Sequence, residues 1–161
     1  MSAEPPAPDE ATAYHEAGHA VMALALGRPV ACVSVRPDHQ FLGTCEFGKP
    51  VFRPSEDWLE REALIALAGA AAEARHAGDY AWGAAAKDLA YVEELARQRA
   101  GGERQAGRLV RRLLAKAEHL LAKEENWGAV ERIAAELLRL GEISGRAARH
   151  LFEESRRSSR S

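Results

Sequence analysis

The sequence lacks several features that would point to particular classes of protein. Two cysteines in 161 residues are too few for a disulfide framework, and no run of apolar residues is long enough to span a bilayer. The first eight residues contain neither the basic region nor the apolar core of a secretion signal. The net charge of −2 gives no electrostatic reason to expect binding to nucleic acid or to a membrane. We therefore expect a cytoplasmic protein.

The length and composition predict one domain with its own hydrophobic core. Hydrophobic residues make up 47% of the chain, which is ordinary for a globular protein. We expect a disordered Pro-rich tail over 1–9, a domain over 10–154 and a disordered basic tail over 155–161.

Apolar periodicity and capping residues predict a mainly α fold with a small β-sheet, an α+β domain. Asp9, Ser55, Asn126 and Ser144 are the expected N-caps of four helices. The predicted strands cover 30–35 and 41–47, where β-branched residues are frequent. The predicted helices cover about 10–26, 55–77, 84–99, 103–124, 126–140 and 145–152.

The most informative stretch is His-Glu-x-x-His at positions 15–19. On a helix, residues four apart project side by side, so His15 and His19 can place two imidazole nitrogens on one metal ion. Zinc is the usual ion of such a pair. Glu16 then stands where it can act as general base on a water molecule. The motif predicts a zinc site with Glu16 as its catalytic residue.

The alternative is an amphipathic helix that carries two surface histidines. Residues 17–26, which follow Glu16, are almost all small or apolar. A helix that is apolar nearly all round is buried, and buried histidines need polar partners. A metal ion would satisfy both histidines, so this context favours the metal site.

A catalytic zinc site usually has three protein ligands, and the third is ambiguous from the residues alone. The class with a third histidine six residues after the motif does not apply, because Ala25 occupies that position. Glu73 lies among alanines on a predicted helix, where a solvated charge is not expected. Asp88 begins another helix, where a carboxylate also favours the helix dipole. Both residues stay candidates.

The sequence resembles the zinc peptidase domain of the FtsH-type AAA proteases. The strongest similarity is Ala13–Ala20, and weaker similarities lie at 67–73, 83–89 and 137–145. This resemblance implies a zincin-like helical metallopeptidase fold. It also implies that Asp88 is the third zinc ligand and that Glu73 supports the zinc ligands without binding the ion itself.

The chain also departs from that family. It contains no Gly-rich phosphate-binding loop, so we expect no ATP-driven unfolding by this chain. Ala70, Ala74 and Lys87 replace an Arg, a Glu and an Asn that the family typically has. A separate ATPase partner and a homo-oligomer both stay open.

These patterns predict a zinc-dependent metallopeptidase that acts on peptides or unfolded chains. We expect substrate to add as an extended strand along the predicted sheet, at Leu42, Gly43, Thr44 and Cys45. The alternative is a catalytically inactive zinc-binding adaptor of the same fold, which a ligand from Cys32 or Cys45 would favour. The intact Glu16 favours the enzyme, because a purely structural site needs no general base. Nothing in the sequence favours hydrolysis of non-peptide amides.

Overall fold

The computed structural model describes residues 9–37, 43–48 and 57–160. Helices dominate this part of the chain, and one small sheet joins them, which confirms the predicted fold class. In order, the elements are α1 (Glu10–Ala25), β1 (Val30–Ser34), β2 (Thr44–Phe47), α2 (Trp58–Ala77), α3 (Ala86–Arg99), α4 (Glu103–Leu121), α5 (Glu124–Leu140), β3 (Glu142–Ser144) and α6 (Gly145–Ser159).

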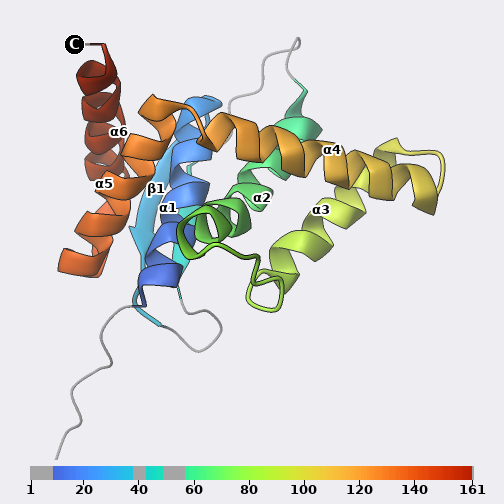
Figure 1. Cartoon of the computed structure of the whole chain (residues 1–161), viewed down its shortest axis with the longest axis horizontal. Coiled ribbons are helices and arrows are strands. Elements are labelled where there is room, and N and C mark those ends of the chain that lie inside the picture. The colour runs from blue at the N-terminus through green and yellow to red at the C-terminus, as the bar shows by residue number, and fades with distance from the viewer. Residues whose placement is uncertain (1–8, 38–42, 49–56, 161) are drawn as a thin grey trace, which may run out of the picture.

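The centre of the fold is the packing of α1 against α2 (Figure 1). Asp9 caps α1 as predicted, and its carboxylate accepts a hydrogen bond from the amide of Ala11. A Cβ atom at Gly18 would lie 2.5 Å from the carbonyl oxygen of Ala68 and 2.6 Å from the Cβ of Ala72. Because such contacts are too short for real atoms, the two helices can approach this closely only with glycine at position 18.

The sheet has the strand order β2-β1-β3, and both pairs are antiparallel. Val33 of β1 lies opposite Cys45 on one side and Ile143 on the other. β2 is therefore an edge strand. β3 was not predicted, because three residues after a helix carry no periodicity of their own. The strand forms only because the end of α5 brings it beside β1.

The remaining helices surround this centre. α4 packs on α2 and α3, while α5 packs on α1 and α6 covers α5 and β1 (Figure 1). Gly78 and Gly141 end α2 and α5 with positive φ angles of 95° and 83°, so both predicted helix ends are confirmed. Among the described residues, no helix is both long and apolar enough to cross a membrane.

Three predictions of local structure need correction. Asn126 is not an N-cap: α5 already begins at Glu124, and Asn126 is buried and donates from its amide nitrogen to the carbonyl of Leu120. The tail predicted from residue 155 is helical to Ser159, because Ser155 is buried and donates to the carbonyl of Glu125. Asp57, not Ser55, caps α2; Ser55 itself lies outside the described residues.

Replacement of Gly18 by alanine should destabilise the fold by about 1–3 kcal/mol, because the new methyl group would force α1 and α2 apart. The matched control is Gly107→Ala in α4, where the nearest neighbour of a new Cβ would be Nη1 of Arg111, at 3.8 Å. That control should stabilise the protein by up to about 1 kcal/mol, because alanine favours helix. Urea denaturation of both variants measures the difference, and equal effects would contradict the close packing of α1 on α2.

Candidate metal centre

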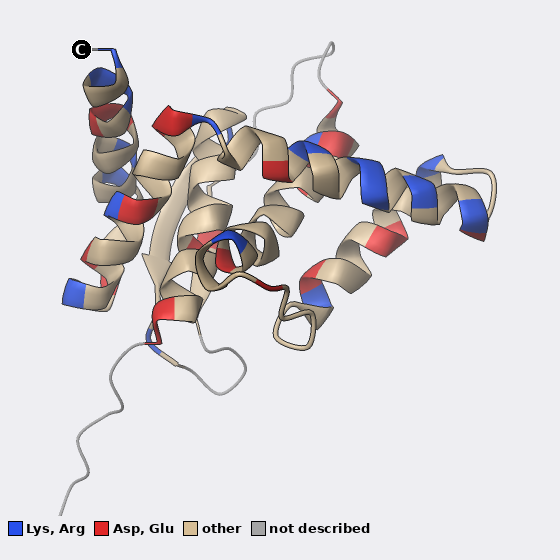
Figure 2. Cartoon of the chain, viewed as in Figure 1, with Lys and Arg blue, Asp and Glu red and all other residues tan. Residues whose placement is uncertain are grey.

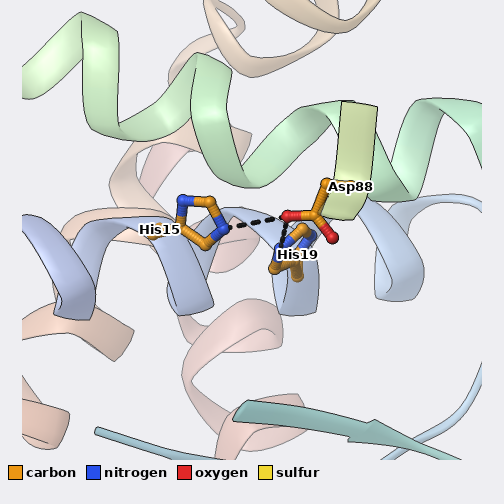
Figure 3. A group of neighbouring side chains, drawn as sticks. All are labelled: His15, His19 and Asp88. Atoms are coloured by element: carbon orange, nitrogen blue, oxygen red, sulfur yellow. Dashed lines mark hydrogen bonds and ion pairs between the residues drawn. The ribbon is translucent and has the colours of Figure 1, made fainter. Parts of the chain in front are cut away.

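Three side chains from two helices meet beside α2. His15 and His19 project from α1, and Asp88 projects from the first turn of α3 (Figure 3). The Oδ2 atom of Asp88 lies 3.1 Å from Nε2 of His15 and 3.3 Å from Nε2 of His19. The two imidazole rings are 4.7 Å apart and nearly perpendicular. One carboxylate oxygen thus faces both ring nitrogens.

A glycine in α2 makes room for the two rings. A Cβ atom at Gly69 would lie 2.4 Å from Nε2 of His19 and 2.7 Å from Nε2 of His15. The backbone of α2 therefore lies directly against the ring nitrogens. Any side chain at position 69 would collide with them. The packing of α2 on α1 brings this backbone against the rings.

Partners on α2 set the orientation of both rings. Nδ1 of His19 lies 2.8 Å from the carbonyl oxygen of Ile65, to which it can donate. Nδ1 of His15 lies 3.8 Å from Oε1 of Glu73, a carboxylate that is 7% exposed. Histidines that bind metals are commonly held through their second nitrogen in this way. Both Nε2 atoms are left to face Asp88.

The charges of this cluster shift the pKa values of its members. Burial disfavours a charged His19, but its hydrogen bond to Asp88 and the charges of Glu16 and Asp88 outweigh this and raise the pKa of His19 to about 9. Burial alone would raise the pKa of Asp88, yet its hydrogen bonds to both histidines hold that pKa well below its usual range. Without a metal, a proton on His19 therefore balances the Asp88 charge.

Glu16 lies next to His15 on α1 and is 6% exposed. Burial raises the pKa of Glu16, and the nearby histidines reduce this effect only in part. A Cβ atom at Gly43 would lie 3.0 Å from Cγ of Glu16, so the chain entering β2 passes close to the Glu16 side chain. A buried carboxylate with a raised pKa is suited to accepting a proton near neutral pH.

A cleft of about 870 Å³ opens over the cluster. Gly43, Thr44 and Cys45 line it, together with all the residues of the cluster, whereas Leu42 lies outside the described residues. The cleft is also lined by residues that the sequence did not single out, among them Arg28, Phe47, Glu62, Ile65 and Tyr91. Tyr91 lies one turn after Asp88 on α3 and is 46% exposed, which places an aromatic ring at the rim.

The donor set fits a divalent metal ion. His15, His19 and Asp88 each offer one ligand atom, and these atoms lie within 4.8 Å of one another. Two imidazoles and a carboxylate are ligands that zinc accepts in catalytic sites. Neither Cys32 nor Cys45 belongs to this group among the described residues, so the closed cysteine site of a structural metal is not formed there.

Two features of the centre escaped sequence reasoning. Gly69 stood within a run of small residues, but only the position of the rings shows that its missing side chain makes their space. The Ile65 carbonyl is a backbone group, so no residue type could have signalled it. The placement of Asp88 beside both histidines, rather than Glu73, depends on the packing of α3 on α2, because Asp88 lies in the first turn of α3.

Gly69→Ala should greatly weaken metal binding while α2 stays helical, because the new methyl group would displace both Nε2 atoms. Titration with zinc against a chromophoric chelator measures the affinity. We expect a loss of at least about tenfold, the range seen when groups that orient metal ligands are removed. Circular dichroism checks that the variant is folded. A folded variant with unchanged affinity would contradict this account of Gly69.

The metal-free protein should lose stability as the pH rises from about 6.5 to about 9. The pKa of His19 is raised from 6.5 to about 9 on folding. Its proton therefore stabilises the folded state fully below the lower value, and this contribution disappears as the pH passes the higher value. Urea denaturation in a chelator across this window measures the slope. Asp88→Asn should flatten it, and a stability that rises with pH would contradict the prediction.

Comparison with known proteins is consistent with this geometry. No curated protein that was compared matches the chain. The sequence model of peptidase family M41 matches residues 5–101, a range that contains the histidine motif, Gly69, Glu73 and Asp88. This match covers more than half of the 161 residues and confirms the resemblance noted in the motifs. The chain therefore belongs to peptidase family M41, the family of FtsH-type zinc peptidase domains.

Proposed function

We propose that this chain is a zinc-dependent peptidase that hydrolyses peptides or unfolded chains. The observation that carries the proposal is the meeting of His15, His19 and Asp88 beside a buried Glu16, at the floor of a cleft. Membership in a metallopeptidase family supports it. In this proposal, the two Nε2 atoms and one Asp88 oxygen hold the ion.

Each residue of the centre then has a separate role. When bound, zinc supplies Lewis acidity, which makes water a better acid and polarises a carbonyl group. Glu16 accepts a proton at its carboxylate and returns it to the leaving amine, and its buried position favours this exchange near neutral pH. Ile65 and Glu73 keep the imidazole rings oriented through their Nδ1 atoms.

Substrate binding follows from the position of β2. This strand lies at the edge of the sheet, and Gly43, Thr44 and Cys45 line the cleft beside Glu16. An extended peptide can pair with such an edge through backbone hydrogen bonds, which do not depend on its sequence. Only an unfolded segment has backbone groups free for this pairing. Folded substrates would require a separate ATPase partner, because this chain contains no phosphate-binding loop.

The test compares zinc-loaded wild-type protein with Glu16→Gln in the cleavage of a labelled unstructured protein. The variant keeps His15, His19 and Asp88, so it should bind zinc normally and lose at least about 10²-fold in rate, as expected for removal of a general base. Glu10→Gln is the matched control, because it removes a carboxylate from the exposed start of the same helix. It should cleave like the wild type.

Two outcomes would contradict the proposal. Equal cleavage by wild type and Glu16→Gln would place the activity elsewhere. Absence of cleavage by every protein, with one zinc bound per chain, would favour the zinc-binding adaptor. A compact folded substrate provides a further check, because its cleavage as fast as that of the unstructured one would contradict the strand-pairing mode.

A further inference from the structure

The outer face of α4 carries an unusual group of basic side chains. Lys and Arg gather along this helix, on the arm that α3 and α4 form at one end of the molecule (Figure 2). We define the α4 basic face as Arg104, Arg108, Arg111 and Arg112, all of which are exposed. The helix begins just after the part of the chain that matches the peptidase family, which ends at residue 101.

Helical geometry puts these four arginines on one side. The first three are spaced by four and three residues, and Arg112 lies next to Arg111, so all four project within about a quarter of the helix circumference. The residues of α4 that face the core, Leu113 and Ala117, lie on the opposite side. The face extends about 12 Å along the axis, at 1.5 Å per residue.

These arginines differ from most others on the surface in having no ion pair among the described residues. Arg97 of α3 contacts three carboxylates, those of Glu93, Glu94 and Glu103. Other exposed arginines have nearby carboxylates as well, such as Arg139 with Glu136 and Arg149 with Glu153. Within the described chain no carboxylate lies within ion-pair distance of the α4 basic face, so four positive charges are left together.

We propose that the α4 basic face binds an acidic segment of a protein partner. Arginine presents a planar fork that matches a carboxylate in two parallel hydrogen bonds, so a row of arginines suits a row of Asp or Glu side chains. A face one helix wide fits a single strand or helix of a partner. The face does not contribute to the cleft over His15 and His19, so a bound segment would leave that cleft open.

An extended polyanion fits this surface less well. A duplex or a lipid surface presents its phosphates over a wide area, whereas the four arginines cover one helix face only about 12 Å long. The helix presents no large apolar side chain outward that could enter a bilayer: the exposed large apolar residues of the described chain are Trp58, Tyr91 and Leu140, none of them on α4. The net charge of −2 also opposes binding to a broad negative surface.

The test measures binding of a labelled peptide of alternating Glu and Ser by fluorescence anisotropy, with a Gln–Ser peptide as the neutral comparison. The full-length variant carries Arg104→Gln, Arg108→Gln, Arg111→Gln and Arg112→Gln. We expect wild type to prefer the acidic peptide and the variant to bind it at least about tenfold more weakly. Binding by wild type should also weaken as salt rises from about 0.05 to 0.5 M.

A matched control variant has the same net charge as the first variant but lacks four arginines at other positions. The control variant carries Arg36→Gln, Arg139→Gln, Arg146→Gln and Arg149→Gln, on exposed positions away from α4. It should bind the acidic peptide like the wild type. Equal losses in the two variants would overturn the proposal, because they would show attraction to overall charge. Tighter binding to phosphatidylserine vesicles or duplex DNA than to the acidic peptide would overturn it as well.

Binding of the acidic peptide to the α4 basic face should be independent of peptidase activity. Both four-arginine variants should cleave an unstructured peptide at the wild-type rate, because neither changes a residue of the cleft. If the wild-type protein showed no peptidase activity, the proposed function would be contradicted. The result of the peptide-binding measurement would still stand.

Discussion

The close approach of α1 and α2 is the constraint on which the centre depends. Gly18 lets the two backbones come together, and Gly69 on the facing side keeps the space in front of the histidine rings free. A larger residue at the first position would separate the helices, and one at the second would enter the site itself. The small-residue faces of these helices therefore have two roles, in packing the core and in leaving room for the two histidine rings.

The same packing concentrates ionisable groups where water is scarce. His15, Glu16, His19 and Glu73 are each less than 10% exposed, and Asp88 completes the group from α3. Buried charges are costly unless they are paired, and here a proton on His19 balances Asp88 in the absence of a metal. An ion at the centre would replace that proton. Binding of that ion would then compensate for the free energy that the fold loses by burying these groups.

The two halves of the chain serve the centre differently. Every residue of the cluster, and the strand edge beside it, lies within the part that matches the peptidase family. The helices after residue 101 hold this part in place: α4 supports α2 and α3, and α5 supports α1. α6 supports β1, and a Cβ at Gly145 would collide with the carbonyl of Val30, so this helix begins directly against the strand. A supporting helix has one face free, and on α4 that face is basic.

The sequence alone determined the features that depend on local spacing and residue type. It predicted the helical class, the pairing of His15 with His19 on one helix turn, and most helix ends. It also predicted, through family resemblance rather than spacing, that Asp88 rather than Glu73 completes the cluster. These features could be predicted because helix periodicity and short motifs depend on residues that are close together in the sequence.

Only the tertiary structure decided features that join distant segments. β3 exists because α5 delivers three residues to β1, and the role of Gly69 appears only when two rings lie against it. The helical continuation to Ser159 depends on a contact of Ser155 with α5. Each of these contacts joins residues far apart in the chain. The contacts are stabilised by burial and hydrogen bonds that no local sequence pattern indicates.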